Sequence, residues 1–144
     1  MKLSRTVSYA LRATLLLAQE ETKRPVPCSQ LAKEGEMPER FLLQILRNLV
    51  NEGLLRSTRG VDGGYTLVQS PSELSVLDII EAIEGPMSSE VLENAAQPSD
   101  VQQLATPGPD ERLQSALRDV SQTLRQQLDA IKIAHLLPSP SNHN

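Results

Sequence analysis

The stretch that decides the fold is residues 29–68, SQLAKEGEMPERFLLQILRNLVNEGLLRSTRGVDGGYTLV. Residues 29–34 are predicted to form a short helix with Leu31 and Ala32 facing inward, and residues 35–37 make a tight turn. A second helix is predicted over 38–52, because apolar residues recur there at helical spacing and Gly53 follows as a stop. Two short helices joined by a tight turn predict a helix-turn-helix.

The same stretch ends in a predicted β-hairpin. Residues 54–57 and 65–68 can pair as two short strands, and the loop between them, TRGVDGG, contains three glycines. This glycine-rich loop is not a nucleotide-binding phosphate loop, because it leads into a strand and not into a helix.

The flanking sequence completes the arrangement. Residues 3–19 predict a helix that is apolar over a wide arc, and residues 75–84 predict another, with the capping-box sequence SVLD at its start and Gly85-Pro86 at its end. The order helix, helix-turn-helix, hairpin, helix predicts a winged helix-turn-helix domain over residues 1–86. The expected fold class is therefore mainly α with a small β-hairpin.

Beyond this domain the sequence predicts a long helix on a flexible connection. Residues 87–109 are rich in Ser, Pro and Gly and predict a linker, 110–137 predict the helix, and 138–144 predict a disordered tail. The helix has an apolar stripe that an 86-residue domain is too small to cover, so a second copy of the chain is expected to bury it in a homodimer. The stripe consists of Leu113, Leu117, Val120, Leu124, Leu128 and Ile131.

Composition excludes several classes of protein. Cys28 is the only cysteine and His135 and His143 are the only histidines, so neither an internal disulfide nor a metal cofactor is expected, and no catalytic set can be assembled. No apolar stretch is long enough to span a bilayer and no secretion signal is recognisable, which predicts a cytoplasmic protein without a membrane partner.

Charge is unevenly distributed along the chain, although the net charge is only -4. Residues 1–60 contain ten Lys or Arg against six Asp or Glu, a net charge of +4, whereas residues 61–144 contain four against twelve, a net charge of -8. A basic first part can meet phosphates, while an acidic remainder keeps the protein soluble and discourages the wrong surface from touching DNA. Ordinary solvated faces in a short chain are the alternative explanation.

Several segments together resemble the Rrf-type family of winged-helix transcriptional regulators. They are MKLS with SYALRA, the helix containing Leu31-Ala32, the segment FLLQIL, and above all RGVDGGY followed by IIEAIEG. The resemblance covers residues 1–86 strongly and the long helix more loosely. It implies a transcription factor, usually a repressor, that dimerises through its long helix and binds an imperfect palindrome in double-stranded DNA.

One departure from the family pattern concerns the cofactor. Sensor members hold an iron–sulfur cluster with three cysteines between the fourth helix and the long helix, and residues 87–109 of this chain contain neither cysteine nor histidine. The sequence therefore predicts a member without the cluster. Its effector is left open between a partner protein, a small molecule and a thiol modification.

Candidate DNA-contacting residues follow from the resemblance and from helix-turn-helix geometry, in which the start of the second helix enters the major groove. Gln44 can pair with adenine and Arg40 with guanine, each through two hydrogen bonds. Arg59 resembles the wing arginine that the family places in the minor groove. Lys2 and Arg5 are expected to contact phosphates, and the wing glycines allow the backbone to approach phosphates closely. The full set of candidate contacts consists of Lys2, Arg5, Glu39, Arg40, Gln44, Arg47, Arg59, Gly60, Gly63 and Gly64.

Alternatives remain for these residues and for the whole protein. Arg40, Gln44 and Arg47 could form a solvated helix face, and the glycines could serve only a tight hairpin. The protein could be an interaction module that has lost DNA binding. It could also be a redox-sensing regulator, because Cys28 lies at a helix start, where the dipole lowers a thiol pKa, although a small structural side chain is the simpler explanation.

Overall fold

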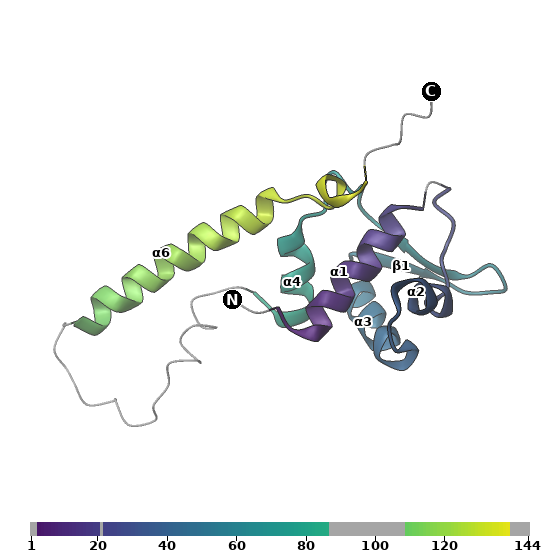
Figure 1. Cartoon of the computed structure of the whole chain (residues 1–144), viewed down its shortest axis with the longest axis horizontal. Helices are drawn as coiled ribbons and strands as arrows, with labels where there is room; N and C mark the ends of the chain where they lie inside the picture. Colours follow the sequence, from purple (N-terminus) through teal and green to yellow (C-terminus); the bar gives the residue numbers. More distant parts are fainter. Residues whose placement is uncertain (1–2, 21, 87–108, 139–144) are drawn as a thin grey trace.

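The computed structural model describes residues 3–20, 22–86 and 109–138, and Figure 1 shows a compact helical body from which one long helix extends. The elements in chain order are α1 (Arg5–Ala18), α2 (Cys28–Gly35), α3 (Glu39–Asn51), β1 (Leu55–Thr58), β2 (Gly64–Leu67), α4 (Val76–Glu84), α6 (Pro109–Ala130) and the short 3-10 helix η1 (Ile133–Leu136). The winged helix-turn-helix domain with a following long helix is therefore confirmed, and each predicted boundary in residues 3–86 lies within two residues of the observed one.

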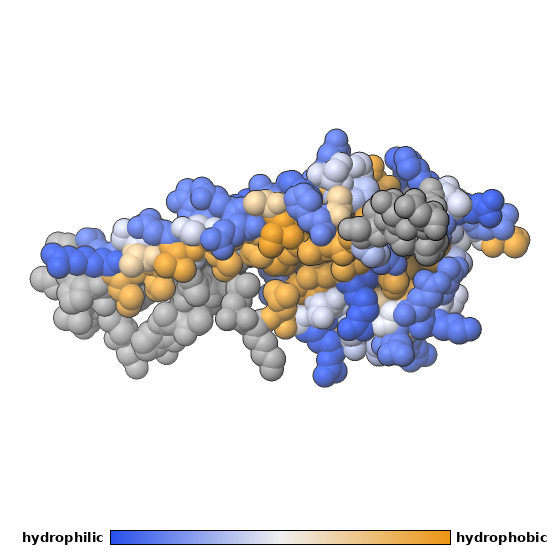
Figure 2. Space-filling model, turned by 45° about the horizontal axis from the view of Figure 1, so that its top comes forward, coloured by the Kyte–Doolittle hydropathy of each residue, from blue (hydrophilic) through white to orange (hydrophobic). Residues whose placement is uncertain are grey.

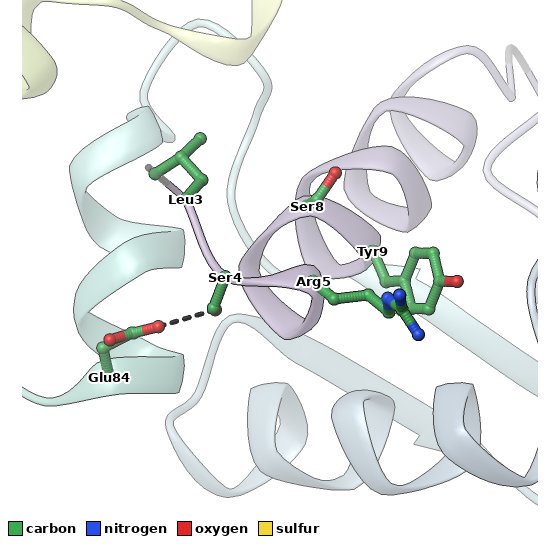
Figure 3. Close-up of a pocket in the computed structure, with 6 residues that line it drawn as sticks. All are labelled: Leu3, Ser4, Arg5, Ser8, Tyr9 and Glu84. Carbon is green, nitrogen blue, oxygen red and sulfur yellow. Dashed lines mark hydrogen bonds between the residues drawn. The ribbon is translucent and has the colours of Figure 1, made fainter. Parts of the chain in front are cut away.

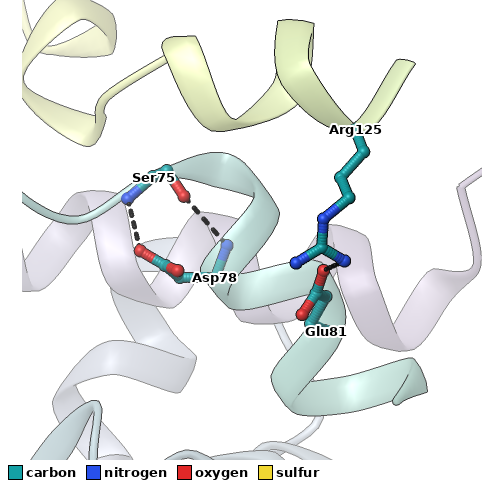
Figure 4. A network of polar contacts seen from close by, with 4 residues as sticks. All are labelled: Ser75, Asp78, Glu81 and Arg125. Carbon is teal, nitrogen blue, oxygen red and sulfur yellow. Dashed lines mark hydrogen bonds and ion pairs between the residues drawn. The ribbon is translucent and has the colours of Figure 1, made fainter. Parts of the chain in front are cut away.

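Local sequence signals explain where the helices begin. The Ser4 hydroxyl accepts a hydrogen bond from the Val7 backbone N–H at 3.2 Å and caps α1. Ser75 and Asp78 form the predicted capping box of α4, each side chain accepting the other's backbone N–H. Figure 4 shows this box, with α6 lying above α4.

The core lies between α1, the helix-turn-helix and α4. One face of each helix is buried there, and α3 shows the pattern most clearly, because its four buried residues follow the helical repeat. These residues are Leu42, Ile45, Leu46 and Leu49. The opposite face of α3 is thereby directed to solvent.

The turn between α2 and α3 differs from the prediction in one respect. Gly35 is the last, buried residue of α2, and the left-handed conformation falls on Glu36, with φ 54° and ψ 51°. A Cβ atom at Gly35 would lie 2.5 Å from the Met37 Cε and 3.3 Å from the Arg12 Cδ. Packing thus accounts for the glycine at position 35, while the strained backbone lies one residue later.

The prediction that the long helix continues to residue 137 was wrong, because α6 ends at Ala130. The chain then pairs with the start of α4: the Val76 N–H donates to the Ile131 carbonyl at 2.9 Å, and the Ile133 N–H donates to the Leu74 carbonyl at 2.8 Å. Ile133 is completely buried in the core. These tertiary contacts draw the chain out of the helix and tie its C-terminal part to residues 71–76.

Two predicted segments fall mostly outside the described residues. The predicted linker 87–109 lies there except for Pro109, which begins α6, and the predicted tail 138–144 lies there except for Pro138. In the described ranges, 3–20, 22–86 and 109–138, no helix is long and apolar enough to cross a membrane.

Candidate nucleic-acid interface

The exposed face of α3 is the first part of the candidate site. Leu42, Ile45, Leu46 and Leu49 form the buried side of α3. On the opposite side, four exposed residues follow one another at spacings of four, three and four, so they lie in one line along the helix. These residues, which we call the recognition face, are Arg40, Gln44, Arg47 and Asn51. The predicted residues Arg40, Gln44 and Arg47 are thus brought together, whereas Asn51 was missed although its spacing from Arg47 could have identified it. Leu43 is half-buried at the edge of this face.

The hairpin of residues 55–67, which we call the wing, is the second part. β1 and β2 pair antiparallel with Leu55 opposite Leu67 and Thr58 opposite Gly64, one residue away from the predicted strand bounds. The Gly63 N–H donates to the Gly60 carbonyl at 3.0 Å and closes the tip, while Arg59 is exposed beside it. In Figure 1 the wing projects from the body on the side opposite α6.

Gly60 and Gly64 serve the wing for different reasons. Gly60 has φ 114°, which side-chain-bearing residues rarely adopt, but its Cβ position is open. At Gly64 a Cβ atom would lie 2.4 Å from the Val26 carbonyl carbon. There the wing is joined to the segment before α2, because Val26 and Tyr65 exchange two backbone hydrogen bonds of 3.0 and 2.9 Å. The wing and the helix-turn-helix therefore hold a fixed relation to one another.

The start of α1 is the third part. It borders an open hollow of about 610 Å³, lined by Leu3, Ser4, Arg5, Ser8, Tyr9 and Glu84. Figure 3 shows Arg5 and Tyr9 extending to the same side of α1, while the Ser4 hydroxyl donates to the Glu84 carboxylate at 2.7 Å. Arg5 is exposed, as a phosphate contact requires, and the predicted contact Lys2 lies outside the described residues.

Aromatic and cationic contacts join the first half of α1 to the helix-turn-helix. The rings of Tyr9 and Phe41 meet edge to face with centroids 5.7 Å apart, and the Arg12 guanidinium lies 5.6 Å from the Tyr9 ring. Arg12 Nη1 also donates to the Gly35 carbonyl at 2.7 Å. The start of α1, the recognition face and the wing thus belong to elements that pack against one another in one domain (Figure 1).

The surroundings of Cys28 do not activate its thiol. Cys28 is the first residue of α2 and half-buried, and its Sγ–H donates to the Glu39 carbonyl at 3.7 Å. Burial, followed by the charge of the Glu39 carboxylate, raises the pKa of the thiol above its ordinary value. The raised pKa argues against the redox-sensing alternative for Cys28. Glu39, one of the predicted DNA contacts, is exposed at the start of α3, and its carboxylate lies close enough to affect the Cys28 thiol. Burial also raises the pKa of Tyr65, with Cys28 as the next cause.

The predicted dimerisation residues divide into two groups along α6. Leu113 and Val120 are about 60% exposed, and Leu117 and Leu124 are half-buried. Leu128 packs against the core. Ile131, predicted as the last member of the stripe, lies beyond the helix, and its carbonyl accepts a hydrogen bond from the Val76 backbone N–H. Figure 2 shows hydrophobic residues along one side of the extended helix and where it joins the body.

An ion pair holds the second half of α6 to α4. The Arg125 guanidinium contacts the Glu81 carboxylate, as Figure 4 shows. The first half of α6 extends past α4, with Leu113 exposed and Leu117 half-buried.

The donor set of the chain does not fit an iron–sulfur cluster. Such a cluster needs several thiolates, and the chain has one cysteine, whose thiol pKa is raised. In the part of the chain that the structure describes, no three His, Cys, Asp or Glu side chains come together as metal ligands would.

Comparison with known proteins assigns the family. Residues 3–139 match the Rrf2 family, described as iron-dependent transcriptional regulators. The chain is 37% identical over 95 residues to the helix-turn-helix-type transcriptional regulator CymR of Bacillus subtilis, covering 65% of this chain and 69% of that protein. It is 38% identical over 89 residues to a candidate helix-turn-helix-type regulator of Mycobacterium tuberculosis, covering 62% of this chain and 55% of that one. The chain thus spans about half the length of this second relative.

Solved structures agree with the sequence comparison. The structure of CymR, the global cysteine regulator of B. subtilis, superposes with a TM-score of 0.73 and 27% identity, covering 94% of this chain and 95% of that one. IscR of T. potens gives the same TM-score and identity over 94% of this chain and 85% of that one. These relatives are regulators and not enzymes. By its sequence and its fold, the chain belongs to the Rrf2 family of transcriptional regulators.

Proposed function

We propose that the protein is a sequence-specific DNA-binding transcriptional regulator that acts in the cytoplasm as a homodimer without an iron–sulfur cluster. The observation that supports this most is the recognition face, because all four of its exposed residues can hydrogen-bond base edges. The face belongs to the same helix-turn-helix to which backbone hydrogen bonds join a wing with an exposed arginine. Family membership supports the same function.

Each of the three parts of the interface would contact a different feature of the DNA. Arg40 and Gln44 face bases in the major groove, with Arg47 beside them, and each bidentate pair discriminates one base pair from the others. Arg59 enters the minor groove, where A·T tracts concentrate negative potential. Arg5 and Lys2 contact phosphates and fix the protein's register without selecting a sequence.

The target would be an imperfect palindrome, because a homodimer presents two such faces about a twofold axis. The uncovered half of the α6 stripe, from Leu113 to Leu124, supports pairing with a second copy. Repression is the proposed output, since the family's members are usually repressors. The signal is an unidentified partner protein or small molecule.

To test this proposal, the wild-type protein first selects duplexes from a randomised library. The affinity of single variants for these duplexes is then measured. Gln44→Ala or Arg40→Ala should weaken binding by about 1–3 kcal/mol and relax the preference at one base pair, because a bidentate pair is lost. Arg5→Ala should weaken all sequences alike and make the salt slope shallower by about one unit. Arg118→Ala, on the exposed side of α6, is the matched control and should have no effect.

Each outcome has a clear meaning. Equal losses on every sequence for the Arg40, Gln44 and Arg59 variants would leave only non-specific electrostatics and defeat the proposed recognition. If the wild-type protein selects no sequence at all, a protein-interaction module becomes the better description.

A further inference from the structure

The tip of the wing has a feature that the proposed function does not use. Val61 is fully exposed, the most exposed large apolar residue in the part of the chain that the structure describes. A single apolar residue on a surface is ordinary. Here, however, it lies in the tip between Arg59 and Asp62, in the element that a winged helix inserts alongside DNA.

The position of Val61 is set by the fold. The hydrogen bond from the Gly63 N–H to the Gly60 carbonyl closes the tip at 3.0 Å. The base of the wing is held by the two hydrogen bonds between Val26 and Tyr65 and by the close approach of Gly64 to Val26. Because Val26 lies two residues before the start of α2, the base of the wing is tied to the helix-turn-helix that carries the recognition face.

The net charge of the tip contributes little to holding it on DNA. Residues 59–63 contain one cation, Arg59, and one anion, Asp62, so their net charge is zero. Attraction of Arg59 to phosphates is offset by repulsion of Asp62. A stable contact of the tip therefore needs a term other than net charge, and the exposed isopropyl group of Val61 can supply one through apolar contact.

We propose that Val61 is a specificity-determining residue of the wing that lies in the minor groove beside Arg59 and is excluded there by guanine. This inference rests on the proposed function. The guanine N2 amino group projects into the minor groove, whereas A·T pairs present only acceptors and leave the floor open. Apolar side chains recur at minor-groove contacts, where they can insert between base steps. Val61 thereby selects A·T pairs next to the sites of the recognition face.

The test uses one duplex selected by the wild-type protein from a randomised library and two derivatives of it. In one derivative the A·T pairs flanking the recognition-face sites become G·C, and in the other they become inosine·C, which lacks the amino group in the minor groove but resembles G·C in the major groove. Binding is measured by fluorescence anisotropy at several salt concentrations. The variants are Val61→Ala and the isosteric Val61→Thr, with Val68→Ala, a second exposed valine, as the matched control.

The wild type should bind the A·T and inosine·C duplexes alike and the G·C duplex more weakly. Val61→Ala and Val61→Thr should lose about three- to tenfold in affinity on the first two duplexes and little on the third, because buried apolar area is lost. Their salt slopes should equal that of the wild type, since no charge changes, whereas Arg59→Ala should give a shallower slope.

Two results would overturn the inference while leaving the proposed function intact. One is that both Val61 variants show the same ratio of affinities for the A·T and G·C duplexes as the wild type. The other is an equal loss on all three duplexes, which would make Val61 a non-specific contact. A wild-type protein that selects no duplex would overturn the proposed function and this inference with it.

Discussion

Two opposing effects act on the side chain of Cys28. The start of a helix favours a thiolate, whereas burial and the neighbouring Glu39 carboxylate favour the neutral thiol, and the raised pKa means that the second pair prevails. Cys28 is therefore poorly suited to sense oxidants. The fraction of thiolate at neutral pH is smaller than in an ordinary cysteine, so nucleophilic reactions of this residue should be slow.

This prediction is checked by the rate of iodoacetamide labelling between pH 7 and 10, followed by mass spectrometry. The midpoint for the folded protein should lie above that of the same protein unfolded in urea. Glu39→Gln should lower the midpoint by removing the carboxylate, and Glu52→Gln, at the far end of α3, should not. A folded midpoint below the unfolded one would restore the redox-sensing alternative.

At the scale of the element, the turn of the helix-turn-helix contains backbone strain at Glu36 that a substitution can relieve. Glu36 has φ 54°, a conformation that costs a side-chain-bearing residue about 1–2 kcal/mol and glycine much less. Glu36→Gly should therefore raise the free energy of unfolding by up to about 1 kcal/mol, after the larger entropy of glycine in the unfolded chain is subtracted.

Urea unfolding followed by circular dichroism measures this change. Glu34→Gly, at an exposed position inside α2, is the control and should lower the free energy of unfolding by about 1 kcal/mol. A loss of stability in Glu36→Gly similar to that of the control would show that the turn is not strained at this residue.

The sequence predicts the elements well because their signals are local. The apolar spacing of α3 predicts its buried residues and hence an exposed line that includes Arg40, Gln44 and Arg47, and SVLD predicts the cap of α4. The end of α6 is not predictable in this way. Its apolar spacing continues to Ile131, whereas the helix ends at Ala130, where the chain begins to hydrogen-bond to residues 74–76.

The remaining differences have the same tertiary origin. The left-handed residue of the turn is Glu36, whereas Gly35 is the last residue of α2 and lies buried beneath Met37. Gly64 is required because the Val26 backbone lies against it, which no pattern within the hairpin reveals. The pKa of Cys28 is raised first by burial and then by Glu39 of the next helix, two tertiary effects that the position of Cys28 at a helix start does not reveal.

At the scale of the whole molecule, α6 allows a specific test of the proposed dimer. Leu113→Lys and Val120→Lys together should weaken dimerisation roughly a hundredfold or more, because a symmetric interface would bury each new charge twice. Light scattering over a range of concentrations measures this. Gln122→Lys, on the other side of α6, adds a charge as a control and should leave the dimer intact.

These point variants are a sharper test than deletion of residues 110–144. The deletion also removes Ile133 from the core and should destabilise the domain itself. A dimer that persists in the double variant, with helix content unchanged by circular dichroism, would place the interface elsewhere.

The cofactor prediction also concerns the whole molecule. One cysteine in each chain supplies too few thiolates for a cluster, so the purified protein should be colourless and should bind DNA in the presence of an iron chelator. Iron and acid-labile sulfide analysis checks this. Stoichiometric amounts of both would require ligands from two subunits.

The burial of Ile133 has a consequence for biosynthesis. η1 packs against α1, so the first and last described helices of the chain complete one core together. A nascent chain on the ribosome reaches that state only after residue 133 has left the exit tunnel, long after the recognition face has emerged. Such distant closure slows folding. A newly made molecule should therefore acquire its full stability only after η1 has emerged from the ribosome.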